Sequence, residues 1–414
     1  MSIASMIHNL VCEFADRFAD CPQAAVSKPA WAALKQSGTE LWLDTGDIAE
    51  AGTLWAAEFS GLTTNNTWLN VEVQKGIYDE LIAAVAQRLK NHVDGRQLER
   101  EIAFVLNAVH GLRLVRRFGC KVSVELHTDL AHDIQGTLDY AARFRALGSE
   151  QFIIKVPMTP AGLIAVRRLS AAGTPVNLTV GFSARQNFLA AMLARPSYVN
   201  VFVGRIAAFL DASQLAPGIP VAVYTTLASQ HAIREAQQLC GAHVRQIAAS
   251  MRAIELIPAL AGVDVHTINT TIAQQFANDY RGEAFAARVS SKLPPPPFPV
   301  ATDGPDLRVL WEIPESFRRA TLQLSSMADD KLSPETIRDT FAVAGHADFL
   351  PNWTMEDQQQ AQDDGVVPKW SNWCQRSTSN QIGLDALMGL SVLMAFVKDQ
   401  AAMDERIRSL ITSN

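Results

Sequence analysis

The sequence predicts an α/β fold: a (β/α)8 TIM barrel with N-terminal helices and a helical C-terminal extension. Short apolar, β-branched runs alternate with longer stretches of helical period from about residue 40 to residue 280. Eight such runs occur, and most are followed by a helical pattern, as in a closed parallel barrel. The alternative, a doubly wound open sheet, normally begins with a glycine-rich turn, whereas the first run here leads into Thr45-Gly46-Asp47.

The predicted elements follow in order. Residues 1–39 predict one or two helices, and residues 40–290 predict the barrel. Ile102–Phe118 and Ile134–Leu147 show the apolar period of helices that pack on a barrel. The predicted strands are Leu41–Asp44, Ser60–Thr63, Val122–Glu125, Phe152–Val156, Val176–Val180, Val199–Val203, Val244–Ala248 and Val263–Ile268.

Residues 291–414 predict a proline-rich linker and a helical C-terminal extension. The run Leu293–Pro299 cannot form a helix or a central strand, because proline lacks an N–H donor and fixes φ, so it predicts a linker or a surface strap. Ser333 and Pro334 predict a helix start, as N-cap and first-turn residue. Leu384–Ile411 carries apolar residues at helical spacing and predicts an amphipathic helix.

The composition narrows the class of protein. The chain has 414 residues, of which 48% are hydrophobic and 19% charged. This suits a barrel with an appendage, or two domains, and excludes wholesale disorder. The net charge of −6 argues against a nucleic-acid partner. The five cysteines are scattered and form no C-x-x-C pair, which predicts a reducing, cytoplasmic environment.

We expect neither a signal peptide nor a membrane span. Charged side chains interrupt the apolar residues of the first twenty positions, unlike the core of a signal peptide. The longest apolar run, Ala386–Val397, spans twelve residues and contains Gly389 and Ser391, so it predicts a buried helix. A cytoplasmic protein without a membrane partner is the expectation, and the sequence leaves its oligomeric state open, a homo-oligomer included.

Polar residues stand at or just beyond the predicted strand ends, where the active site of a (β/α)8 barrel forms. One lysine, two carboxylates, several amides and two arginines therefore converge on one mouth. These residues are Asp44, Asn65, Glu125, Lys155, Asn177, Thr179, Asn200, Arg205 and Arg252.

Lys155 is the central candidate, because it interrupts the otherwise apolar strand Phe152–Pro157. A lysine inside a covered strand costs free energy, and burial favours the neutral amine that attacks a ketone. The alternative is a lysine that reaches solvent from the barrel end. Asp44 and Glu125 supply acid–base partners on other strands. Asp44 could instead cap a helix or a turn, and Glu125 could form an ion pair with a lysine such as Lys155.

Asn177 and Thr179 share one face of their strand, since side chains alternate with period two. Ordinary inward-facing packing is the alternative for Thr179. Arg205 and Arg252 each follow a strand near a predicted helix start, a place suited to phosphate oxygens. Surface salt bridges are the alternative for both arginines.

Seven segments together resemble the transaldolase family, in the family's order and over about residues 40–280. The resemblance implies a (β/α)8 barrel that transfers a dihydroxyacetone unit between sugar phosphates through a lysine Schiff base, without a metal or an organic cofactor, in cytoplasmic carbohydrate metabolism such as the pentose phosphate pathway. The segments are Leu43-Asp44-Thr45-Gly46-Asp47-Ile48, Thr63-Thr64-Asn65, Val122-Ser123-Val124-Glu125 with Leu130-Ala131-His132-Asp133, Ile153-Ile154-Lys155-Val156-Pro157, Val176-Asn177-Leu178-Thr179, Phe202-Val203-Gly204-Arg205-Ile206 and Ala249-Ser250-Met251-Arg252.

The resemblance also implies catalytic roles. Lys155 matches the family's Schiff-base lysine. Asp44 matches the acid–base group that takes the C4 hydroxyl proton when the C–C bond breaks. Glu125 and Thr179 match the pair that holds and activates the catalytic water.

The implied substrate contacts involve further residues. Asn65 and Asn177 match residues that bind the dihydroxyacetone moiety, and Arg205 and Arg252 match the phosphate clamp. Phe202 stands where aldolase-like relatives tend to carry tyrosine, which favours transfer over simple aldol cleavage.

The chain also departs from the family pattern. Asn200 replaces a serine whose hydroxyl helps to bind the donor, Asn66 replaces a proline, and Met158 replaces an alanine. The C-terminal extension has no counterpart that we can place. Two alternatives therefore remain: a specialised transaldolase-like aldolase or transferase with an altered donor or acceptor, and a catalytically silent barrel that serves as a binding subunit.

Overall fold

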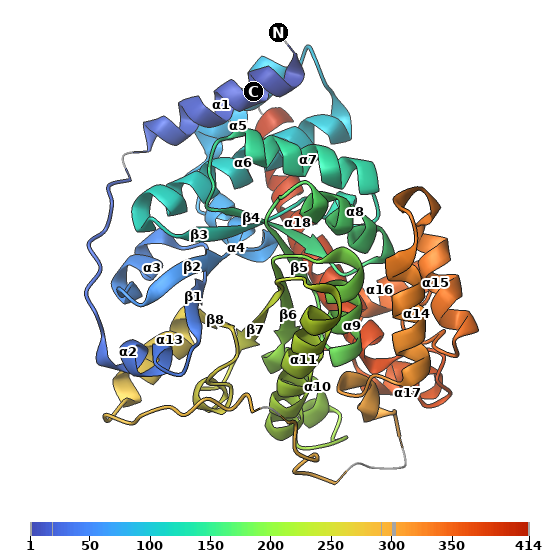
Figure 1. The fold of residues 1–414 in the computed structure, drawn as a ribbon. Coiled ribbons are helices and arrows are strands. Elements are labelled where there is room, and N and C mark those ends of the chain that lie inside the picture. The colour runs from blue at the N-terminus through green and yellow to red at the C-terminus, as the bar shows by residue number, and fades with distance from the viewer. Residues whose placement is uncertain (1, 19, 291, 300–303, 413–414) are drawn as a thin grey trace.

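The computed structural model describes residues 2–18, 20–290, 292–299 and 304–412. Its centre is a closed barrel of eight parallel strands in the order β1 to β8, so the predicted (β/α)8 fold is confirmed (Figure 1). The strands are β1 Glu40–Asp44, β2 Phe59–Thr63, β3 Lys121–Glu125, β4 Phe152–Pro157, β5 Val176–Thr179, β6 Tyr198–Phe202, β7 Arg245–Met251 and β8 Val265–Asn269.

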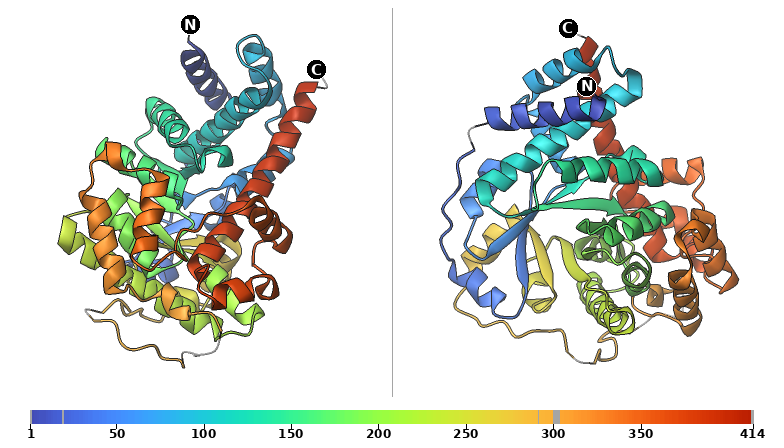
Figure 2. Two further views of the ribbon diagram at one scale, coloured as in Figure 1. Left: turned by 90° about the vertical axis from the view of Figure 1, so that its right-hand side faces the viewer. Right: turned by 45° about the horizontal axis from the view of Figure 1, so that its top comes forward.

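Helices connect the strands and cover the outside of the barrel (Figure 2). They are α3 Ile48–Leu54, α4 Asn66–Gln74, α5 Asp79–Leu89, α6 Gly95–Phe118, η1 Thr128–Leu130, α7 Ile134–Ala146, α8 Pro160–Ala171, α9 Ala184–Leu189, the π-helix η2 Ala190–Ala194, α10 Val203–Ala212, α11 Gly218–Cys240, α12 Leu256–Ala259 and α13 Thr270–Asp279.

Five strands end differently from the prediction: β4 and β8 end one residue later, β6 ends one residue earlier, and β5 and β7 differ for local backbone reasons. β5 ends at Thr179, because Val180 has a φ of 67° and leaves the extended region. β7 continues beyond the predicted Ala248 to Met251, across a register shift typical of a β-bulge. Ser250, with a φ of 58°, lies in this irregular stretch, directly ahead of the residues that follow β7 at the mouth.

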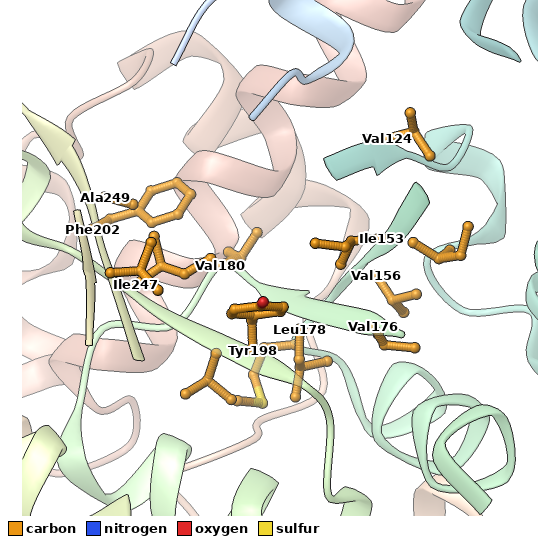
Figure 3. Close-up of a cluster of buried hydrophobic side chains, with 14 of the residues drawn as sticks. Val124, Ile153, Val156, Val176, Leu178, Val180, Tyr198, Phe202, Ile247 and Ala249 are labelled. Atoms are coloured by element: carbon orange, nitrogen blue, oxygen red, sulfur yellow. The ribbon is translucent and has the colours of Figure 1, made fainter. Parts of the chain in front are cut away.

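The core follows from the sequence of the strands. Apolar side chains of β3 to β7 pack against one another and against the surrounding helices, as Figure 3 shows for Val124, Ile153, Val156, Val176, Leu178, Tyr198, Phe202, Ile247 and Ala249. Gly61 of β2 is required by close packing, since a Cβ there would lie 2.6 Å from the ring of Trp42. A rigid, filled barrel therefore supports the polar residues at its mouth.

Two helices precede the barrel in the chain. α1, Ile3–Arg17, packs against α6, and α2, Pro29–Lys35, packs against β1 and α13 (Figure 1). Trp31 of α2 is buried, with its ring centroid 5.1 Å from that of Phe59 and 5.0 Å from that of Phe276.

The proline-rich run Leu293–Pro299 contains neither helix nor strand. Phe298 packs against Tyr224 and Trp311, and the Tyr224 hydroxyl donates to the Pro294 carbonyl oxygen at 2.9 Å. The run therefore lies on the protein as a strap. Residues 1, 19, 291, 300–303 and 413–414, which belong to the predicted terminal segments, lie outside the described residues.

The helical extension follows the strap. It contains η3 Leu307–Leu310, α14 Glu315–Ser326, η4 Asp329–Lys331, α15 Pro334–Val343, α16 Met355–Asp364, α17 Trp370–Thr378 and α18 Leu384–Thr412. Ser333 caps α15 as predicted, since its side chain accepts from the Thr336 N–H. α18 runs back along α4, α5 and α6 to the N-terminal side of the molecule (Figure 2).

α18, Leu384–Thr412, confirms the predicted helix Leu384–Ile411 to within one residue. By length and composition it is the one helix in the described part of the chain that could cross a membrane. However, 61% of its most apolar window is buried inside the protein. Its apolar residues thus serve the packing of the fold, which agrees with the predicted buried helix.

Candidate active site

The C-terminal ends of the strands surround a cavity of about 230 Å³. The predicted residues that line it are Asp44, Asn65, Lys155, Asn177, Asn200, Phe202, Arg205 and Arg252. The sequence did not single out the other lining residues, which are Thr63, Thr67, Trp68, Ala249, Ser250, Thr267 and Phe396. Glu125 and Thr179 do not line the cavity but stand on β3 and β5, on either side of β4.

Lys155 lies inside the protein with an exposed fraction of 4%, so it does not reach solvent from the barrel end. Its Nζ donates to the Thr64 carbonyl oxygen at 3.3 Å and lies 3.6 Å from Oε2 of Glu125. The ring of Phe396 faces the same nitrogen, with its centroid 5.3 Å away. The ion pair that the sequence left open for Glu125 is therefore present, and Lys155 is its partner.

Glu125 ends β3 in a buried position. Burial raises the pKa of this carboxyl group, against the opposing effects of the Lys155 charge and of a hydrogen bond from the backbone N–H of Asn66. That N–H lies 3.2 Å from Glu125 Oε2. A proline at position 66, as the family resemblance implies, would have no N–H to give. Asn66 therefore gives Glu125 a hydrogen-bond donor that a proline at this position would lack.

Asp44 ends β1 and is partly buried. Its Oδ1 accepts from Thr63 Oγ1 at 2.9 Å and from Trp68 Nε1 at 3.3 Å. Burial raises the pKa of Asp44, and the nearby Lys155 charge opposes the rise. The N-cap of the following helix α3 is Asp47, so the helix-capping alternative for Asp44 does not hold.

Two asparagines form a buried amide chain beside Lys155. Asn200 Nδ2 donates to Asn177 Oδ1 at 2.8 Å, and Asn177 Nδ2 donates to Ser123 Oγ at 3.1 Å. Within the described residues, Asn200 Oδ1 has no hydrogen-bond partner, and neither does the hydroxyl of Thr179. Both are buried acceptors, which normally find a partner, so each has bonding capacity left for a ligand or a water.

The two arginines stand together at one end of the cavity. Arg205 lies in the first turn of α10, and Arg252 directly follows β7. The close approach requires Gly204, because a Cβ there would lie 2.0 Å from the Ser250 carbonyl oxygen. Burial and the charge of Arg252 lower the pKa of Arg205 to about 10.

No carboxylate of the described residues forms a salt bridge with Arg205 or Arg252, so the salt-bridge alternative does not hold there. Arg205 Nε is buried without a partner among the same residues, and its Nη1 donates to the Val366 carbonyl oxygen at 3.1 Å. Phe202, the N-cap of α10, provides no side-chain cap. Two repelling guanidinium groups and an uncapped helix start are features that suit an anion.

The residues that the sequence missed fall into two kinds. Thr267 is 2.7 Å from Thr63 through their hydroxyl oxygens and extends the contacts of Asp44 to β8. Thr267 lies two residues before the end of β8, and this position could have identified it as a residue of the barrel mouth. Trp68 and Phe396 sit on helices, where an apolar residue carries no sign of a site. The described residues contain no group of three or more His, Cys, Asp or Glu side chains that could hold a metal ion.

Comparisons with known proteins agree with the geometry. A family model described as Transaldolase/Fructose-6-phosphate aldolase matches residues 41–333. A transaldolase of Xanthomonas campestris pv. campestris is 28% identical over 249 residues, which are 57% of this chain and 74% of that protein. A transaldolase of Chlamydia pneumoniae is 26% identical over 314 residues, or 73% of this chain and 90% of that protein.

Proposed function

Because the chain belongs to the transaldolase/fructose-6-phosphate aldolase family, we propose that it transfers a dihydroxyacetone unit from a ketose phosphate to an aldose acceptor through a Schiff base on Lys155. One observation carries the proposal: a buried lysine on an apolar strand has a buried carboxylate 3.6 Å away and shares a cavity with a second carboxylate and two arginines without carboxylate partners in the described chain.

The reaction begins with attack of Lys155 Nζ on the C2 carbonyl of the donor. The resulting carbinolamine loses its hydroxyl as water, which requires an acid. Glu125 suits this step, because its carboxyl group lies 3.6 Å from Lys155 Nζ and burial raises its pKa. Thr179 offers an unpartnered hydroxyl on the next strand, with which Glu125 would hold the water.

Asp44 then takes the proton of the C4 hydroxyl group. The C3–C4 bond breaks, its electron pair enters the iminium system, and an aldose leaves while the dihydroxyacetone unit stays on Lys155 as an enamine. Addition of this enamine to the acceptor aldehyde reverses the steps. Asp44 is bound by Thr63 and Trp68 and Glu125 by Lys155 and Asn66, so the two carboxyl groups have the separate environments that distinct acid–base roles require.

The arginines hold the phosphate group of the substrate. Arg205 and Arg252 bind its oxygens, and the uncapped start of α10 adds backbone N–H donors. An anion between the two guanidinium groups also removes their mutual repulsion, which favours a phosphorylated substrate.

A second candidate function concerns the donor. Asn200 donates one amide N–H to Asn177, and its Oδ1 has no partner among the described residues, on a side chain longer than the serine of the family pattern. The serine of the family pattern both donates and accepts. This favours a specialised transferase whose donor presents a different arrangement of hydroxyl groups, since a site built around particular hydroxyls rejects others strongly.

Borohydride trapping tests the proposal. The protein is incubated separately with fructose 6-phosphate and sedoheptulose 7-phosphate, reduced, and analysed by intact and peptide mass. We expect a stable adduct on Lys155 and none in Lys155→Met, which keeps an unbranched side chain of similar length. An adduct that persists in Lys155→Met refutes the assignment of the lysine, and no adduct with either donor favours the silent barrel.

A further inference from the structure

The last helix supplies part of the active-site wall. Phe396 of α18 lines the cavity and is 5% exposed. The family model ends at residue 333, so this wall comes from a part of the chain outside the match. The mouth of the barrel is thus completed by a residue that the family comparison does not reach.

Buried polar contacts fix the start of α18 to the barrel. Arg185 binds Asp385 through two nitrogens, at 2.8 and 2.7 Å, and Ser183 Oγ donates to the same carboxylate at 2.7 Å. Asp348 of the extension also binds Arg185, at 2.7 Å. An ion cluster of this kind holds its members in one geometry, because separating them would leave a buried charge unpaired.

Contacts beyond Phe396 fix the same face of the helix. Thr67 donates to Asp399, and Arg96 forms an ion pair with Asp404 at 2.5 Å. Asp399 and Asp404, three and eight positions beyond Phe396, lie on the same side of the helix as the ring, so the ring is held from both directions.

The Phe396 ring limits the access of water to Lys155. Nζ has Glu125 and the Thr64 carbonyl oxygen as polar neighbours and the Phe396 ring as an apolar one. Lys155 is only 4% exposed with this ring in place. Phe396 therefore excludes solvent from one side of the nitrogen.

We propose that Phe396 is a specificity-determining residue that keeps the lysine-bound dihydroxyacetone unit from reacting with water, and so favours transfer to an aldose over hydrolytic release. This inference rests on the proposed function. In the competing reaction, the enamine takes a proton at its nucleophilic carbon and water adds to the iminium carbon. The C–N bond then breaks, which returns dihydroxyacetone and the free Lys155 amine. Excluding water suppresses this side reaction without a change in the groups that form the Schiff base.

The experiment measures how the unreduced covalent intermediate on Lys155 divides between the two products. The protein is loaded with fructose 6-phosphate or sedoheptulose 7-phosphate, whichever forms the Lys155 adduct, and is then given erythrose 4-phosphate or glyceraldehyde 3-phosphate, whichever it accepts; transfer product and free dihydroxyacetone are both quantified. Phe396→Ala frees a volume larger than the space of about 30 Å³ that one water molecule occupies in the liquid. Water can then reach the intermediate, so the ratio of release to transfer should rise about tenfold or more. Phe396→Leu keeps an apolar side chain in place and should stay close to the wild type.

Leu393→Ala is the matched control, because this truncation lies on the same helix in a different cavity and measures the effect of a looser α18. The release-to-transfer ratio of Leu393→Ala should equal that of the wild type. Thermal melting shows that each variant is folded, and borohydride trapping shows that each forms the covalent intermediate on Lys155. A Phe396→Ala variant that forms the Lys155 adduct but keeps the wild-type ratio of release to transfer overturns the inference and leaves the proposed function intact. An equal rise of this ratio in Leu393→Ala has the same consequence. A wild-type protein that forms no adduct on Lys155 with any ketose phosphate refutes the proposed function, and the inference with it.

Discussion

Replacing Arg205 by methionine should stabilise the ligand-free protein while it weakens the binding of phosphorylated substrates. Burial and the charge of Arg252 lower the pKa of Arg205 from 12.5 to about 10. The pKa of Arg205 is lower in the folded state than in the unfolded state, so the free energy of unfolding rises with pH only above about 10. At neutral pH the destabilisation by the Arg205 charge is fully present. The difference in pKa corresponds to roughly 3 kcal/mol, as an upper limit, because counter-ions screen the repulsion.

Methionine removes the charge and keeps an unbranched side chain. The hydrogen bond from Nη1 to the Val366 carbonyl oxygen is lost, at a cost of about 1 kcal/mol. We therefore expect Arg205→Met to gain about 1–2 kcal/mol in the free energy of unfolding. At the same time, loss of a charge-assisted phosphate contact should raise KM by about ten- to a hundredfold, since such a contact contributes about 1.5–3 kcal/mol.

Urea unfolding at neutral pH and steady-state kinetics with a ketose phosphate measure the two effects. Exposed Arg234, replaced by methionine, controls for the general effect of one lost positive charge and should change neither quantity. Unfolding in the presence of inorganic phosphate provides a further comparison, because the anion should stabilise the wild type more than Arg205→Met. A variant that is less stable than the wild type and has an unchanged KM would refute the anion-site interpretation.

Further variants separate the steps of the proposed reaction. Asp44→Asn should still form the borohydride adduct on Lys155 but should lose about 10²–10⁴-fold in the rate of C–C cleavage; loss of both would assign Asp44 to an earlier step. Asn66→Pro removes the N–H that binds Glu125 Oε2, and proline is tolerated at the first position of α4, so the variant should raise the pKa of Glu125 and move the corresponding limb of the pH–rate profile to higher pH. Asn66→Ala keeps the N–H and should leave the limb in place, and equal profiles for both variants would contradict the role of this bond. Asn200→Ser should improve kcat/KM on fructose 6-phosphate and erythrose 4-phosphate, a pair on which we expect the wild type to be poor; high wild-type activity without a gain in the variant would contradict an altered donor site.

The sequence predicted those parts of the site that contrast with their surroundings. Lys155 was visible because it interrupts an apolar strand, and Asp44 because it ends one. Strand ends in a parallel barrel converge on one mouth, so the positions along the chain were enough to bring these groups together.

The remaining parts depend on packing that no local pattern encodes. The bulge before Arg252 and the left-handed backbone of Val180 come from tertiary contacts that override the preference of those residues for extended structure. Phe396 reads as one more apolar residue of an amphipathic helix, and only the path of the extension places it against Lys155.

The return of α18 to the barrel mouth also bears on the order in which the protein is made. The eight strands leave the ribosome long before Phe396, and a nascent barrel can begin to fold as its segments emerge. Such a chain would already carry Lys155, both carboxylates and both arginines, yet one side of its cavity would stand open to water. Under the proposed function, a chain that ends after the barrel would lack the apolar wall beside Lys155. The final helix therefore completes the proposed site only at the end of synthesis.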